Sequence, residues 1–98
     1  MHPLDDSTLQ TCLLHLPDWE PLDGVLSRQF QFANFIEAFG FMTRVALVAE
    51  HMQHYPDWQH HERQLTIRLT TPQQAAITEL DVDLARAIDK LWASTHTH

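Results

Sequence analysis

Cysteine and basic residues are both scarce in this 98-residue chain, which has one cysteine, Cys12, and only six lysines and arginines. A single cysteine excludes an intramolecular disulfide framework and a zinc site built on several cysteines. It fits a reducing, cytoplasmic location. The net charge of −7 argues against direct nucleic-acid binding, because phosphates require a basic surface. The expected partners are therefore small molecules or other proteins.

Long hydrophobic runs and export signals are also lacking. The most apolar stretch, from Phe35 to Ala49, is interrupted by Glu37 and Arg44, so it is too short and too charged to span a bilayer. The N-terminus has neither a basic start nor an apolar core of a signal peptide. An apolar content of 44% suffices for one hydrophobic core, and we expect one domain over residues 1–98. A chain this short also gains from burying surface in an oligomer.

Helix-capping residues and apolar periodicity predict three helices. The first runs from Asp5 to Leu14, where the leading aspartates suit the helix dipole. A second begins at Asn34, with Glu37 as the partner of a capping box, and ends before Pro56. Its apolar stripe is wide enough for more than one face to be covered. Thr78 and Asp81 form another capping box, which begins the last helix.

Four extended segments lie between these helices. Asp23-Gly24 is a hairpin signal between the first two segments. Two more strands are expected from Asp57 to Glu62 and from Leu65 to Thr71, the latter with alternating apolar residues. The resulting order, α-β-β-α-β-β-α, predicts an α+β fold with three helices on one face of a four-stranded antiparallel sheet.

The segment EHMQHYPDWQHH, residues 50–61, concentrates groups capable of acid–base chemistry or metal binding. Glu50 and His54 stand four apart near a helix end, where such a pair is also ordinary surface chemistry. A metal ion would find three neighbouring ligands here, His51, His54 and Glu50. No fourth ligand is evident, and we predict no metal site. The terminal His96-Thr97-His98 is expected to be a solvated tail.

The run FQFANFIEAFGFMTRVALVAE followed by HYPDW resembles the pterin-4a-carbinolamine dehydratase family. The resemblance extends from Trp19 to about Trp92. It implies the α+β fold, self-association as a dimer or tetramer, and no metal or organic cofactor. Active members dehydrate 4a-hydroxytetrahydropterin, and imidazoles suit the required acid and base.

The family pattern implies a set of site residues in this chain. Catalytic positions fall on His54, Glu50 and Tyr55. The implied positions around a bound pterin are Trp19, Pro56, Trp58, Thr70, Thr71 and Asp81.

Two positions depart from the family pattern. Tyr55 stands where a second histidine or an asparagine is usual, and Pro72 stands where a later histidine is usual. A phenol titrates near ~10 and is a poor proton acceptor at neutral pH, while proline offers no proton at all. His60 and His61 alternate between opposite faces of their strand, so one of them would face the pocket, although the family does not use these positions.

Two functions follow from this comparison. The missing imidazoles favour a non-catalytic or weakly catalytic protein-binding role, like the divergent family branch that assists Rubisco assembly in α-carboxysomes, with the Rubisco large subunit as a client. The alternative is a functional dehydratase that relies on His54. The sequence therefore leaves enzymatic activity open.

Overall fold

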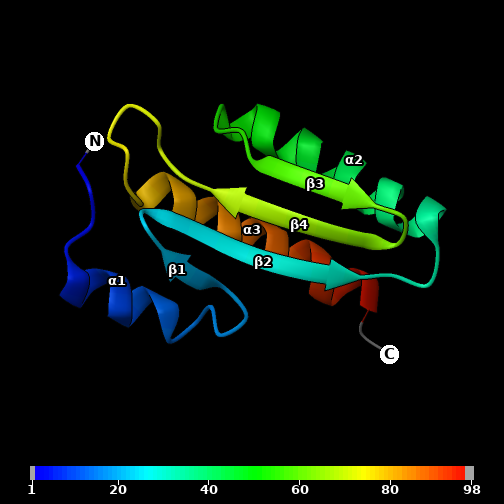
Figure 1. The fold of residues 1–98 in the computed structure, drawn as a ribbon, viewed down its shortest axis with the longest axis horizontal. Coiled ribbons are helices and arrows are strands. Elements are labelled where there is room, and N and C mark those ends of the chain that lie inside the picture. The colour runs from blue at the N-terminus through cyan, green and yellow to red at the C-terminus, as the bar shows by residue number, and fades with distance from the viewer. Residues whose placement is uncertain (1, 97–98) are drawn as a thin grey trace.

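The computed structural model describes residues 2–96 and contains three helices and four strands in the predicted order (Figure 1). Thr97 and His98 of the predicted tail lie outside the described residues. The elements are α1 (Asp6–Leu13), β1 (Glu20–Leu22), β2 (Val25–Gln31), α2 (Phe35–Met52), β3 (Asp57–His61), β4 (Gln64–Leu69) and α3 (Glu79–His96). The predicted α+β fold is thus confirmed. Within residues 2–96, no helix has the length and apolar character needed to cross a membrane.

The four strands form one antiparallel sheet in the order β1-β2-β4-β3. The hairpin between β1 and β2 turns at Asp23 and Gly24, which have φ values of 52° and 78°. Two successive left-handed residues match the twist of the flanking strands. Space also favours glycine at position 24, because a Cβ there would lie 3.0 Å from the carbonyl oxygen of Ala75.

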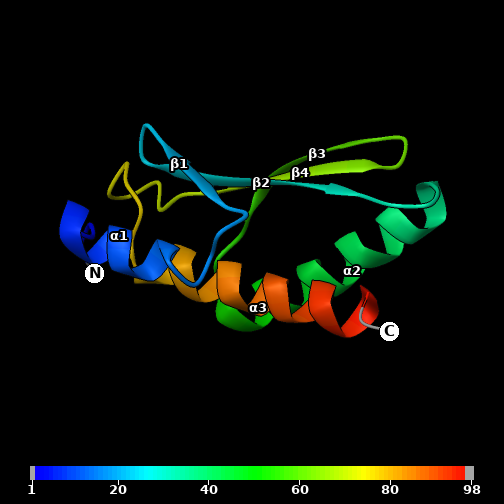
Figure 2. The same ribbon diagram turned by 90° about the horizontal axis from the view of Figure 1, so that it is seen from below.

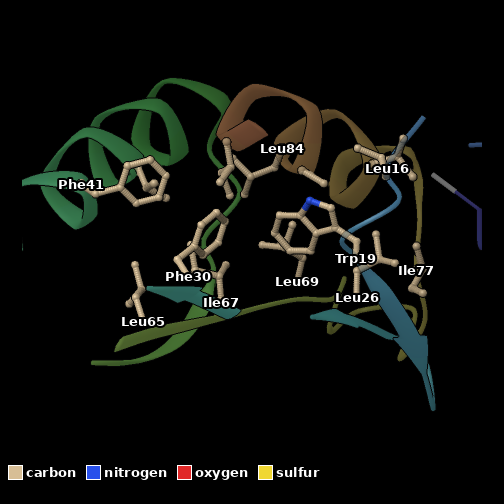
Figure 3. Close-up of a cluster of buried hydrophobic side chains, with 14 of the residues drawn as sticks. Leu16, Trp19, Leu26, Phe30, Phe41, Leu65, Ile67, Leu69, Ile77 and Leu84 are labelled. Carbon is tan, nitrogen blue, oxygen red and sulfur yellow. The ribbon is translucent and has the colours of Figure 1, made fainter. Parts of the chain in front are cut away.

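All three helices lie on one side of the sheet (Figure 2). Alternate residues of β2 and β4 point toward the helices, and Leu26, Phe30, Leu65, Ile67 and Leu69 are fully buried there (Figure 3). From the helix side, Phe41 and Leu84 complete this cluster. Because the apolar residues of each strand repeat with period two, one sheet face forms the core and the other is left polar.

The long helix α2 is apolar on two opposite faces. Ala38, Phe41, Val45 and Ala49 are buried against the sheet and α3. Ile36 and Leu47, on the opposite face, are 80% and 69% exposed. The sequence predicts that more than one face of this helix is covered. In the single chain one face is covered and the opposite face is exposed.

The last strand is shorter than predicted. β4 ends at Leu69, and Thr71 instead forms an isolated bridge with Ala76. A turn begins at Pro72, where the amide of Ala75 donates to the Pro72 carbonyl at 3.1 Å. Proline cannot donate to a sheet ladder, so the strand cannot continue through this position. The loop that results carries Thr71 and Thr78 toward the start of α3.

Candidate functional site

His54 is placed by the way in which α2 ends. Gln53 adopts a left-handed conformation with φ 53°, and the amide of His54 donates back to the carbonyl of Ala49 at 3.1 Å. This return of the chain at a helix C-terminus brings the next residue under the helix end. The His54 residue is consequently only 7% exposed, although the residues on either side of it are on the surface.

A buried carboxylate faces the imidazole of His54. Its Nε2 lies 2.5 Å from Oδ1 of Asp81, whose side chain is fully buried. The contact joins the end of α2 to the first turn of α3 across 27 residues of sequence. A carboxylate held against one imidazole nitrogen fixes the ring orientation and tautomer, which prepares the other nitrogen for acid–base chemistry.

Two threonines complete the surroundings of Asp81. Its Oδ2 accepts hydrogen bonds from the Thr71 hydroxyl and from the Thr78 backbone amide, both at 2.9 Å. The two hydroxyls lie 2.7 Å apart, and the Thr78 hydroxyl accepts from the amide of Leu80 at 3.2 Å. Asp81 therefore caps α3, as the capping box predicts, and at the same time contacts His54.

Glu50 and Tyr55 form a separate pair on the surface. The Tyr55 hydroxyl donates to Oε1 of Glu50 at 2.9 Å, and both residues are exposed. This hydrogen bond to a carboxylate raises the pKa of the Tyr55 hydroxyl. The phenol is thus a weaker acid than an isolated tyrosine and keeps its proton at neutral pH.

The other predicted pterin-contacting residues are dispersed. Trp19 is buried in the core, where its Nε1 donates to Asp89 at 2.8 Å. The Thr70 hydroxyl donates to the carbonyl of Gly24 at 2.7 Å and so stabilises the first hairpin. Trp58 is half-buried against the core from β3, and Pro56, also half-buried, comes directly before that strand. The structure therefore joins His54, Thr71 and Asp81, and puts Trp19 and Thr70 into other contacts.

The later histidines have their own contacts. The His60 ring stacks on Phe35 with centroids 4.6 Å apart, and its Nε2 donates to the carbonyl of Glu62 at 2.7 Å. His61 is exposed beside the Glu62 carboxylate at 3.9 Å. Neither histidine is in hydrogen-bond contact with His54 or Asp81. Across the described residues, no group of three or more His, Cys, Asp or Glu side chains is arranged to hold a metal ion.

Thr78 is the member of this cluster that sequence reasoning missed as a site residue. The capping-box signal identified it and Asp81 as the start of a helix, but the same signal does not say which side chain approaches the other carboxylate oxygen. Only the return of the chain after α2 brings His54 to that oxygen. The cluster of His54, Thr71, Thr78 and Asp81 is the candidate site, and its imidazole–carboxylate pair is suited to proton transfer.

The sequence is similar to those of known proteins. The family model described as Pterin 4 alpha carbinolamine dehydratase matches residues 2–91. A Prochlorococcus marinus protein named "Putative pterin-4-alpha-carbinolamine dehydratase" is 43% identical over 88 residues, covering 90% of this chain and 92% of that protein.

Solved structures are similar as well. A transcriptional coactivator/pterin dehydratase from Brucella melitensis has a TM-score of 0.87 at 33% identity, covering 92% of this chain and 98% of that one. A pterin dehydratase-like protein identified as a RuBisCO assembly factor in the alpha-carboxysome has a TM-score of 0.62 at 18% identity, covering 74% and 84%. The second likeness shows the fold alone. Because the family model matches nearly the whole chain, the protein belongs to the pterin 4 alpha carbinolamine dehydratase family.

Proposed function

We propose that this protein is a slow dehydratase of 4a-hydroxytetrahydropterins, in which His54 is the acid–base residue and Asp81 orients it. The observation that carries the proposal is the 2.5 Å contact between the His54 imidazole and the buried Asp81 carboxylate, at two positions where the family motif has its own histidine and aspartate. The Prochlorococcus relative, named as a dehydratase, supports the same reading. No metal or organic cofactor enters this reaction.

The proposed reaction removes water from the pterin ring. The bond from C4a to the hydroxyl oxygen breaks, and the electron pair of the adjacent ring nitrogen forms the new carbon–nitrogen double bond. A ring N–H proton leaves to His54, and the departing hydroxyl takes up a proton and becomes water. One imidazole can serve both steps because it accepts and returns a proton near neutral pH.

Slow turnover is expected because two family imidazoles are replaced. Tyr55 is engaged with Glu50 as a donor, and Pro72 carries no proton. Each missing acid or base costs roughly 10²–10⁴ in rate, although the two losses need not multiply. In this proposal Glu50 and Tyr55 contribute to the shape and hydrogen bonding of the surface beside His54 and take no proton from the substrate.

A stopped-flow assay with freshly prepared 4a-hydroxytetrahydrobiopterin tests the proposal. We expect the protein to accelerate dehydration above the spontaneous rate, and His54→Ala to remove this acceleration. His61→Ala is the matched control, because that imidazole is exposed on β3 beside the Glu62 carboxylate. An absence of acceleration by the natural chain, or an unaffected rate in His54→Ala, overturns the assignment.

A protein-binding role is the second candidate, and the exposed apolar face of α2 favours it. Phe35, Ile36, Phe39 and Leu47 are all exposed on one helix. Exposed apolar groups gathered on one element are typical of an interface. We propose that a second copy of this chain covers this face, as in the dimer or tetramer that the family resemblance implies.

Light scattering coupled to size exclusion tests this self-association. Leu47→Glu is expected to yield a smaller species, whereas Leu14→Glu, an exposed change at the end of α1, leaves the mass unchanged. An unchanged mass in Leu47→Glu rejects α2 as the interface. A Rubisco large-subunit client stays a prediction, checked by whether this chain raises the yield of assembled Rubisco in a reconstituted system.

A further inference from the structure

The hydroxyl groups around Asp81 form a hydrogen-bond chain with only one consistent direction. The Leu80 amide can only donate, so the Thr78 hydroxyl accepts from it and directs its own proton elsewhere. The Thr71 oxygen, 2.7 Å away, is the acceptor that this proton meets. The Thr71 proton in turn points to Oδ2 of Asp81 at 2.9 Å. The chain thus runs from the backbone of α3 to the carboxylate.

This direction determines the protonation pattern of Asp81. Its Oδ2 already accepts from the Thr71 hydroxyl and from the Thr78 amide, so it carries no proton of its own. Its Oδ1 is left for Nε2 of His54. Both oxygens of the Asp81 carboxylate therefore act as acceptors, so the hydrogen in this contact belongs to Nε2.

The remaining ring nitrogen of His54 is the one that meets the solvent. Among the described residues, no fully buried side-chain nitrogen or oxygen lacks a hydrogen-bond partner. Within residues 2–96, the His54 ring forms its hydrogen bond through Nε2, and Nδ1 forms none. Nδ1 therefore reaches the surface of the molecule, with its lone pair unoccupied by protein donors.

We propose that Thr71 and Thr78 are positioning residues that hold His54, through Asp81, in its Nε2–H tautomer, so that Nδ1 is the atom that exchanges a proton with the ligand. The first part concerns the protein alone, and the role of Nδ1 rests on the dehydratase function proposed above. The network is buried, with Asp81 and Thr78 fully inaccessible and Thr71 nearly so. Water cannot easily replace a hydroxyl that is lost there, so each hydroxyl matters.

Nitrogen NMR of histidine-labelled protein without ligand tests the tautomer directly. The chain has eight histidines, and the His54 signals are those that disappear in His54→Gln. In the natural protein we expect a protonated Nε2 and an unprotonated Nδ1 for His54, with an Nε2 proton that is protected from exchange. A protonated Nδ1 in the natural protein overturns the inference, whatever the enzymatic activity.

Thr71→Val and Thr71→Ser separate positioning from bulk. Valine removes the hydroxyl at nearly constant volume, and we expect the Nε2 proton to exchange about tenfold faster, the size of effect that losing one hydrogen bond to a charged group allows. Serine keeps the hydroxyl and should restore slow exchange. Thr11→Val is the control for hydroxyl loss elsewhere, because the Thr11 hydroxyl bonds only to the Ser7 carbonyl in α1. Equal exchange rates in the valine and serine variants reject the positioning role.

The dehydration rate then distinguishes the two proposals. If dehydration is accelerated, Thr71→Val should lower that rate about tenfold with little change in KM, and Thr71→Ser should recover it. A natural protein that shows the Nε2–H tautomer and no acceleration contradicts the dehydratase function and leaves the positioning network intact. Where Thr71→Val fails to fold by circular dichroism, Thr78→Ser and Thr78→Ala supply the same comparison from the other hydroxyl.

Discussion

Two carboxylate–ring pairs, formed by neighbouring residues of the same motif, have opposite surroundings. His54 meets Asp81 inside the molecule at 2.5 Å, with both side chains almost or completely buried. Tyr55 meets Glu50 on the surface at 2.9 Å, where water reaches both partners. The pairs have similar lengths, so distance alone does not separate a structural contact from an incidental one.

Burial is what separates the two pairs. In the interior, a lost partner leaves a charged or polar group that water cannot solvate, so the penalty is large. At the surface, water replaces the lost partner, and long side chains also lose entropy when they pair. The buried pair also joins α2 to α3 and is embedded in further hydrogen bonds. We therefore expect the fold and the chemistry to depend on the first pair and very little on the second.

The largest expected effect is that of Asp81→Ala. This change removes the partner of His54 and the cap of α3 together, and breaking a buried pair typically lowers the free energy of unfolding by about 3–5 kcal/mol. Urea unfolding followed by circular dichroism measures the loss. Asp83→Ala is the matched control, since Asp83 is exposed and only approaches Arg86 at 3.8 Å. Similar stabilities of the two variants would contradict the importance of burial.

The next effect is a gain of rate. Replacing Tyr55→His and Pro72→His together returns imidazoles to the two positions where the family pattern has them, and each positioned acid or base contributes roughly 10²-fold or more. We expect the stopped-flow dehydration rate to rise by at least about 10² in the double variant. Tyr55→Phe serves as the control, because it disrupts the same surface pair without adding a proton carrier. A double variant no faster than this control would show that these positions do not face the substrate.

A small effect is expected for the surface pair itself. Tyr55→Phe removes the contact at 2.9 Å, and Glu50→Gln removes the charge of its acceptor. Water is available to both partners. The urea midpoint of each variant should coincide with that of the natural protein within experimental error. A double-mutant cycle checks for coupling between the two side chains. A clear loss of stability in either single variant would mean that this pair is buried in the oligomer.

Much of the fold was predictable because it depends on local signals. The Asp23-Gly24 turn, the Asn34 cap and the alternation of β4 all act over a few residues, and each appears where it was predicted. The early end of β4 was not predicted, because the pattern of Leu65, Ile67 and Leu69 continues into Thr71 and only Pro72 interrupts it.

The site was less predictable because it depends on contacts across the chain. The motif selects His54 and Asp81, and the capping box links Thr78 to Asp81, but nothing local indicates that Thr71 shares that carboxylate. The sequence alone is compatible with Trp19 in a pocket wall and with Trp19 in the core. The hydrogen bond from its indole to Asp89, 70 residues away, places it in the core. Such pairings arise from the three-dimensional arrangement of α2, the loop and α3, which periodicity does not encode.

The smallest expected effect is a shift in the titration of Tyr55. The hydrogen bond to Glu50 raises the pKa of this hydroxyl, so Glu50→Gln should lower the pKa toward the ordinary value near ~10. Tyr55 is the only tyrosine, and phenolate absorbance therefore reports it alone.

A proton held more firmly in the folded state stabilises that state below the unfolded pKa, and this contribution disappears as pH rises through the folded pKa. At neutral pH this contribution is present in the natural protein and lost in Glu50→Gln, but at an exposed pair it is too small to move the urea midpoint. Glu62→Gln, an exposed change beside His61, is the control, and an identical Tyr55 titration in both variants would remove Glu50 as its partner in solution.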